Sequence, residues 1–152
     1  LTEHQSDEGA YGLILNHPTG QTVGDLLPSD EFEALRNIPV HFGGPVGQEH
    51  LTFVAFWLHD NTEFKFATRI SAPEATKRVH QPGTLVRAFA GYSGWTAGQL
   101  EGELRKNSWI PTLPNASLLA RDHEQSLWGD LLRSISPYHT ILAEMPDDIY
   151  VN

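Results

Sequence analysis

Three stretches of the chain have the hydrophobic pattern of β-strands. Residues 51–58 are apolar on both faces apart from Thr52, as in a central strand that other layers cover on both sides. Residues 63–70 alternate aromatic or branched side chains with charged ones, which predicts a strand with one solvated face. Residues 84–92 form a third long strand of small and branched residues, and shorter strands are expected at 11–15 and 39–42.

Helices are predicted where a capping residue precedes apolar side chains at helical spacing. Ser71 with Glu74, for example, has the spacing of a capping box, in which each side chain bonds the backbone N–H of the other residue. The same signals place helices at residues 30–36, 71–79, 96–107 and 122–135, with a short helical turn at 22–27. A short strand is expected at 117–120, and the tail after Pro137 is expected to be loop or edge strand.

The order of these elements favours a single α+β domain over residues 1–152. Strands and helices are interspersed, and no repeat, low-complexity segment or Gly/Ser linker divides the chain. The polar residues 3–10 have the character of a turn before the strand at 11–15, and a hairpin turn needs a strand on each side. We therefore expect a hairpin whose first strand is largely missing from this chain.

The composition is that of an ordinary globular protein. Hydrophobic residues make up 39% and charged residues 19%, which excludes disordered and collagen-like chains. The absence of cysteine excludes disulfides, thiolate metal sites and a cysteine nucleophile. Apolar runs are only a few residues long, so no segment of this sequence is expected to span a bilayer. We expect an acidic, cytoplasmic protein with no membrane partner.

The charge distribution argues against direct binding of nucleic acid. The net charge is −9, from 19 acidic and 10 basic side chains, whereas DNA binding requires a sustained basic surface that displaces counterions from phosphate. Five of the ten cations fall in one central stretch, where we expect solvated faces of a strand and a helix. These are Lys65, Arg69, Lys77, Arg78 and Arg87.

No metal or cofactor site is visible in the sequence. The eight histidines include no His-x-His pair, no i, i+4 pair on a helix and no His-Glu-x-x-His motif. The loop Gly43-Gly44-Pro45-Val46-Gly47 is glycine-rich, but it lacks the Lys-Ser/Thr with which a phosphate loop reaches phosphate and magnesium. Because Pro45 also removes a backbone N–H, a tight turn between strands is the better interpretation.

Ser93 lies between a predicted strand and a predicted helix, which is the setting of a serine-hydrolase nucleophile. The nucleophile elbow requires Gly-x-Ser-x-Gly, and here Trp95 occupies the position of the second glycine. A glycine turn with Tyr92 and Trp95 packed inward is the simpler interpretation. A small serine hydrolase that uses Ser93 stays an alternative, with partners drawn from Asp122, His123 and His139.

Five motifs in this order resemble the bacterial YqgE/AlgH family. They are Asn16-His17-Pro18-Thr19, Gly24-Asp25-Leu26-Leu27, Phe42-Gly43-Gly44-Pro45-Val46, the run from Gly91 to Leu104, and Trp109. The resemblance implies a cytosolic α+β fold with a branched mixed sheet, partly closed like a small barrel and surrounded by helices. It implies no established reaction or cofactor, and some members of the family are described as regulators of exopolysaccharide or transcription. The family has arginine where His17 stands, and imidazole lacks the bidentate fork of arginine.

The absence of catalytic motifs favours a non-catalytic binding or regulatory domain that acts through a protein partner. A DNA-binding transcriptional regulator is a further alternative to the hydrolase.

Three strand-exit loops are rich in residues that shape the backbone, and such loops can share one end of a sheet. If they do, they form one interaction surface with a polar rim and an aromatic floor. Its residues are Asn16, His17, Pro18, Gly43, Gly44, Pro45, Tyr92, Ser93, Gly94 and Trp95. The alternative is that each loop makes only its own local turn and the aromatic side chains pack inward.

Overall fold

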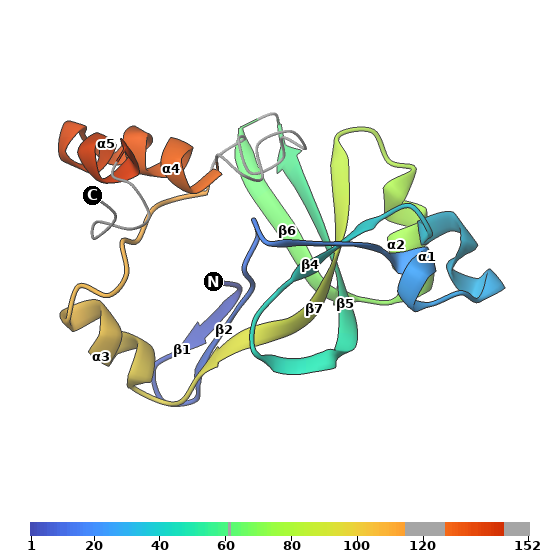
Figure 1. Cartoon of the computed structure of the whole chain (residues 1–152), viewed down its shortest axis with the longest axis horizontal. Coiled ribbons are helices and arrows are strands. Elements are labelled where there is room, and N and C mark those ends of the chain that lie inside the picture. The colour runs from blue at the N-terminus through green and yellow to red at the C-terminus, as the bar shows by residue number, and fades with distance from the viewer. Residues whose placement is uncertain (61, 115–126, 145–152) are drawn as a thin grey trace, which may run out of the picture.

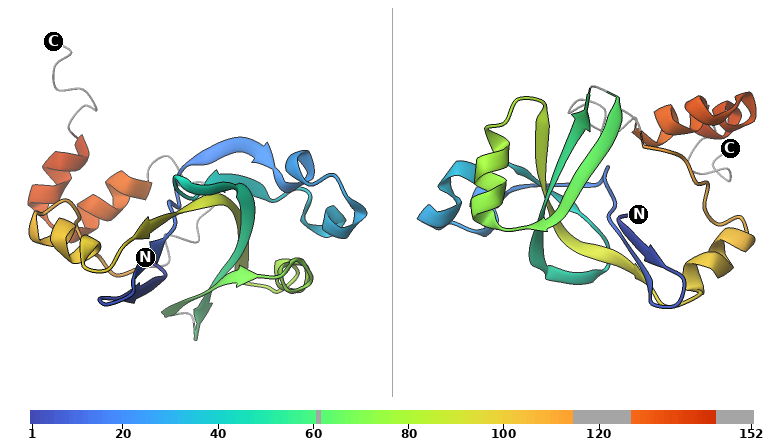
Figure 2. Two further views of the ribbon diagram at one scale, coloured as in Figure 1. Left: turned by 90° about the horizontal axis from the view of Figure 1, so that it is seen from below. Right: turned by 180° about the vertical axis from the view of Figure 1, so that it is seen from behind.

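The computed structural model describes residues 1–60, 62–114 and 127–144. A strongly twisted sheet occupies the middle of the molecule, with α1 and α2 at one end and α3, α4 and α5 at the other (Figure 1). The two further views in Figure 2 show the same separation of the helices. None of the described helices has the length and apolar character needed to cross a membrane.

The described residues form seven strands and six helical segments. The strands are β1 (Glu3–Gln5), β2 (Gly9–Gly12), β3 (Pro18–Thr22), β4 (Pro39–Phe42), β5 (Val46–His59), β6 (Glu63–Ile70) and β7 (Thr84–Trp95). The helices are α1 (Val23–Leu26), the 3-10 helix η1 (Asp30–Leu35), α2 (Ala72–Val79), α3 (Gln99–Arg105), α4 (Leu127–Ile135) and α5 (Pro137–Glu144). The predicted strand at 117–120 and the predicted cap at Asp122 lie outside the described residues.

The sheet is mixed and branches at β7. One path runs β1-β2-β7-β4-β3, and β5 pairs with both β7 and β6. Only the β4–β7 pairing is parallel among the described strands. These findings confirm the predicted α+β class and the branched mixed sheet. The pairings between the described strands form a branched path and not a closed ring.

The larger hydrophobic core lies between the sheet and the helices α1, η1 and α2. Each helix contributes one fully buried side chain, and these meet apolar residues of β4, β5 and β7. The contributions are Val23, Leu35 and Ala75 from the helices against Val40, Phe53, Ala55, Val86 and Ala88 from the strands. The helix at 71–79 begins as predicted, because the Ser71 side chain accepts a hydrogen bond from the backbone N–H of Glu74.

A smaller core lies on the other face of β5 and β7, where Phe89 packs with Val54 and Phe56. The chain between β2 and β3 covers this core with Leu13 and Leu15. Three backbone groups of this connecting segment are held by hydrogen bonds: Ile14 N–H to Gly43 O at 2.9 Å, Arg87 Nη1 to Leu15 O at 3.0 Å, and Phe42 N–H to His17 O at 2.8 Å. The segment therefore has a fixed path although it is not a strand.

Three sequence predictions about local structure are wrong. The tail after Pro137 was expected to be loop or edge strand, but its described part forms the helix α5, which packs against α4. The strand expected at 11–15 ends at Gly12. Pro18 begins β3 at the edge of the sheet, where its missing N–H breaks no hydrogen bond between strands. The predicted turn at 91–95 is the continuation of β7, because β2 supplies pairing partners for Ser93, Gly94 and Trp95.

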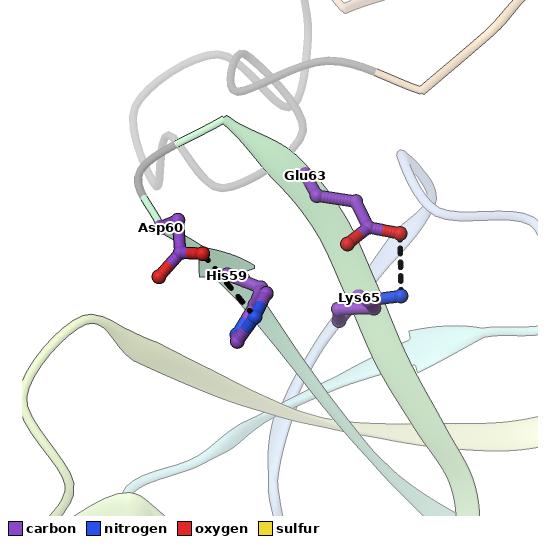
Figure 3. A network of polar contacts seen from close by, with 4 residues as sticks. All are labelled: His59, Asp60, Glu63 and Lys65. Atoms are coloured by element: carbon purple, nitrogen blue, oxygen red, sulfur yellow. Dashed lines mark hydrogen bonds and ion pairs between the residues drawn. The ribbon is translucent and has the colours of Figure 1, made fainter.

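The hairpin between β5 and β6 ends in a solvated polar network (Figure 3). Lys65 Nζ donates a hydrogen bond to Glu63 Oε1 at 2.5 Å, and this bond holds the pKa of the Glu63 carboxyl below its usual range. His59 Nε2 lies 3.4 Å from Asp60 Oδ2 at the end of β5. Because all four side chains are exposed, solvent screens both pairs and they contribute little to stability.

Candidate functional site

The paired strands β2 and β7 present two different faces. Gly12 lies opposite Ser93, and Tyr11 lies opposite Gly94. Since successive side chains of a strand point to opposite faces, Ser93 and Trp95 belong to one face, while Tyr92 and Gly94 belong to the other. The two faces border separate cavities.

The face with Ser93 and Trp95 borders a cavity of about 570 Å³, which we call the apolar groove. Its walls come from the segment 12–16, the end of β7, helix α3, the linker 109–112 and helix α4. Most of the lining side chains are apolar or aromatic, and they are Leu1, Leu13, Ile14, Leu15, Trp95, Leu100, Leu104, Trp109, Ile110, Pro111, Leu127, Trp128 and Leu131. Asn16, Ser93 and Thr112 are its polar members.

Glu103 on α3 connects two of the three tryptophans of the groove. Its Oε2 accepts hydrogen bonds from Trp109 Nε1 at 2.6 Å and from Trp95 Nε1 at 2.9 Å. Its Oε1 accepts a third bond from Gln99 Nε2 at 3.0 Å. These bonds hold the pKa of the Glu103 carboxyl below its usual range, and the bond from Trp109 has the largest effect. The group is therefore ionised at neutral pH.

Large apolar side chains of the groove and its surroundings are open to solvent. Trp109 is 49% exposed and Ile110 45% exposed. Trp128 of α4 and Tyr138 and Ile141 of α5 are also exposed. Trp109, Ile110 and Trp128 line the same groove, and clustered exposed apolar side chains of this kind are typical of interaction sites.

The structure divides the predicted site residues between these faces and the loops around them. Asn16, Ser93 and Trp95 line the apolar groove. Gly43 is adjacent, because Ser93 Oγ donates a hydrogen bond to its carbonyl at 3.5 Å. Gly44 packs so closely on β7 that a Cβ there would lie 2.2 Å from the carbonyl carbon of Tyr92.

The other predicted residues do not line the groove. Tyr92 and Gly94 are on the opposite face of β7. His17, Pro18 and Pro45 are exposed, and the imidazole of His17 packs edge-on against Phe42 with ring centroids 5.7 Å apart.

Among the described residues, Ser93 makes no contact with a histidine, the base that a serine nucleophile uses. Its Oγ is hydrogen-bonded to the Gly43 carbonyl. His139, one of the proposed partners, pairs instead with Ser136 Oγ at 2.8 Å. Asp122 and His123 lie outside the described residues. Over the same described residues, no three acidic or histidine side chains converge as a metal site.

Two residues at the groove had no functional role in the sequence analysis. Trp109, in its wall, was named only as a family motif, and Glu103, which bonds Trp109 and Trp95, was not singled out. Gln99 and Glu103 are four residues apart, the spacing that brings side chains together on one helix face. That spacing could have pointed to Glu103, whereas its two indole contacts depend on where the linker after α3 folds back.

The fold and the groove define an α+β protein with a branched sheet and a solvent-exposed apolar site, and comparison with known proteins supplies the family. The AlgH-like family model matches residues 1–139. The chain is 34% identical over 163 residues to a UPF0301 protein of Cytophaga hutchinsonii, covering 100% of this chain and 86% of that protein. A UPF0301 protein of Bacteroides fragilis is 31% identical, with 96% and 76% covered. The chain belongs to the AlgH-like family, as its motifs predicted, and the family has no assigned function.

Two solved structures share the fold. The solution structure of the AlgH protein from Pseudomonas aeruginosa superposes with a TM-score of 0.62 at 24% identity, covering 97% of this chain and 84% of that one. A crystal structure of a Corynebacterium diphtheriae protein gives a TM-score of 0.65 at 21% identity, with 94% and 79% covered. At this level of identity the likeness establishes the fold alone.

Proposed function

We propose that this AlgH-like protein is a non-catalytic binding module of the cytoplasm that acts through a protein partner, which docks in the apolar groove. The observation that carries the proposal is the cluster of exposed tryptophan and isoleucine side chains around a cavity of about 570 Å³. Aromatic anchors in a concave, desolvated site supply most of the binding energy in protein interfaces.

The charge at the groove indicates the chemistry of the partner. Glu101 and Glu103 both lie on α3, and hydrogen bonds hold the pKa of each carboxyl below its usual range. The whole chain carries a net charge of −9. A partner segment with an apolar anchor flanked by basic side chains would complement this surface and would be attracted to it over a distance.

Four of the five central cations are buried or lie near carboxylates, which weighs against nucleic-acid binding. Arg87 is buried, Lys65 pairs with Glu63, and Arg78 Nε donates to Glu74 Oε1 at 2.6 Å. Arg69 lies 3.3 Å from Glu3 Oε1. Carboxylates among these cations interrupt the sustained basic surface that displaces counterions from phosphate, so we expect no direct DNA contact.

The test places a photoreactive side chain at Ile110 in the groove and, as a matched control, at Leu26 in α1 at the opposite end of the molecule (Figure 1). The two positions are 45% and 39% exposed. We expect cross-linking in cells to one protein from position 110 and not from position 26. Equal yields from both positions, or cross-links to nucleic acid, would contradict the proposal.

A second step uses the cross-linked partner in purified form. Trp109→Ala removes the exposed anchor and should weaken binding by about tenfold or more, as interface hot spots do. Its free energy of unfolding should change by less than about 1 kcal/mol, because the side chain is half exposed. Leu26→Ala is the control and should leave the affinity unchanged.

A further inference from the structure

The opposite face of β2 and β7 borders a second cavity, of about 400 Å³, which we call the tyrosine pocket. Two glycines and five larger side chains line it, and the latter are Tyr11, His50, Thr52, Arg69 and Tyr92. Every one of these five side chains carries a hydrogen-bond donor or a cation, and no carboxylate lines the pocket. This composition is unusual for a chain with a net charge of −9.

Arg69 reaches the pocket through an irregularity in β6. Between the pairs Phe53–Ile70 and Ala55–Ala67, β6 has one residue more than β5, which defines a β-bulge. Within it Arg69 has φ of +54°, a left-handed conformation that favours glycine. The bulge places the guanidinium 4.4 Å from the centroid of the Tyr11 ring. Strained residues of this kind are concentrated at binding sites.

His50 reaches the pocket through a second irregularity, in β5. Between the pairs Val46–Tyr92 and Leu51–Ala90, β5 advances five residues while β7 advances two. Residues 47–50 therefore bulge out of the ladder. Gly47 lies at the base of this bulge, where a Cβ would be 3.6 Å from the Tyr92 ring and 3.8 Å from His50 Nδ1.

The two tyrosines form the floor. Their rings stack with centroids 4.7 Å apart and planes at 30°. Gly94 leaves room for this arrangement, because a Cβ there would lie 3.2 Å from the Tyr92 ring. Among the described residues, the hydroxyls of Tyr11, Tyr92 and Thr52 have no hydrogen-bond partner, so all three are available to a ligand.

Two carboxylates from outside the pocket lie near Arg69 and His50 but leave part of each side chain open. Glu3 Oε1 approaches Arg69 Nη1 at 3.3 Å, and Glu49 Oε1 approaches His50 Nδ1 at 3.1 Å. All four side chains are more than half exposed. The guanidinium has five N–H donors, and those not facing Glu3 remain available in the fork geometry that suits phosphate oxygens.

We propose that the tyrosine pocket binds a small aryl phosphomonoester, with its phosphate on Arg69 and the hydroxyl donors and its ring against the aromatic floor. The cavity of about 400 Å³ lies within the range of small-molecule sites and exceeds what a phosphate ion alone would fill. This site is separate from the apolar groove, and the proposal does not depend on the proposed function.

The first experiment is an NMR titration of the isotope-labelled protein with phenyl phosphate, inorganic phosphate and phenol. We expect phenyl phosphate to shift the Arg69 side-chain signal and the backbone amides of Gly47, Thr52 and Tyr92. It should bind about fivefold or more tightly than inorganic phosphate or phenol, since each of those probes supplies half of the contacts. Shifts spread over other surfaces, no saturation, or equal binding of phosphate and phenyl phosphate would overturn the proposal.

Variants then separate binding from folding. Arg69→Gln should weaken phenyl phosphate binding by about tenfold or more, and Tyr92→Phe should weaken it while keeping the stacked ring. Glu3→Gln removes the competing carboxylate and should tighten binding, an effect that a purely structural role for Arg69 does not produce. Arg36→Gln is the matched control, because Arg36 is also an exposed arginine paired with a glutamate. An unchanged affinity in Arg69→Gln, or a loss as large in Arg36→Gln, would refute the assignment.

Discussion

Strand β7 passes through two environments that differ in almost every respect. Its first half, residues 84–90, pairs with β5 throughout and with β4 at residues 88–90, and Leu85 to Phe89 are all buried. Its second half, residues 91–95, pairs mainly with β2, and its side chains are partly or fully exposed after Gly91. One continuous strand therefore serves as core at one end and as surface at the other.

The difference shows how the fold separates stability from binding. The first half is packed on both faces, so its side chains have no contact left to offer a ligand. The second half has one face toward the apolar groove and the other toward the tyrosine pocket. The following predictions test whether this division holds, beginning with the largest expected effect.

Phe89→Ala should have the largest effect on stability. The side chain is completely buried and contacts Val54 and Phe56, so its removal leaves a cavity in the smaller core. Such truncations cost about 3–5 kcal/mol in the free energy of unfolding, which urea denaturation would measure. The control is Phe66→Ala on β6, where the same residue type is 40% exposed and the expected loss is under about 1 kcal/mol. Similar losses in both variants would contradict the division.

Trp95→Ala should have an intermediate effect. The indole is partly buried, covers Gly12 and donates its N–H to Glu103 at 2.9 Å. We expect a loss of about 1.5–3 kcal/mol, below that of a fully buried aromatic residue. Trp95→Phe keeps most of the ring contact and should recover more than half of this loss. A loss as large as that of Phe89→Ala would make the second half of β7 part of the core as well.

The sequence carried enough information for the fold class and for most elements. Apolar runs and alternation depend on neighbours within a few residues, so the strand at 51–58 and the helix after Ser71 could be predicted. The continuation of β7 past Gly91 could not, because its partner β2 is about eighty positions away in the chain. The helix α5 was missed because its apolar residues have no clear one-sided pattern.

The candidate sites were harder to predict than the fold. Asn16, Ser93 and Trp95 were chosen for their loop-forming neighbours, and the structure brings these three to one groove. Arg69 and His50 could not be assigned to a pocket, because each reaches it through a β-bulge that leaves no local signal. Local sequence patterns thus predicted most of the strands, but the contacts between strands could be identified only from the folded structure.

Arg69→Gly and Arg69→Ala should differ by about 1 kcal/mol in the free energy of unfolding. Both substitutions remove the contact with Tyr11 and the ion pair with Glu3. Only glycine relieves the left-handed backbone at φ +54°, so the glycine variant should be the more stable of the two. Chemical denaturation of both proteins measures the difference. If alanine were equally stable, the strain at this bulge would be absent and its link to the tyrosine pocket would be lost.

The smallest expected effect is the contribution of the Glu103 carboxylate to stability, which is measured through its dependence on pH. Hydrogen bonds from Trp109, Gln99 and Trp95 hold the pKa of this carboxyl below its usual range in the folded protein. The folded state therefore binds the proton less readily than the unfolded state. The resulting stabilisation is complete above the ordinary glutamate pKa and is lost as the pH falls through the lower folded value.

Two variants test this linkage. In Glu103→Gln the difference in unfolding free energy from the parent protein should be constant at neutral pH and shrink in acid, below about pH 4.5. Trp109→Phe removes the strongest of the three hydrogen bonds while keeping an aromatic ring, so it should raise the pKa of Glu103 toward its usual range. A carbon-detected NMR titration of the Glu103 carboxyl would measure the shift directly. An unchanged pKa would show that the Trp109 indole does not hold this carboxylate in solution, and that the exposed wall of the apolar groove is free to move.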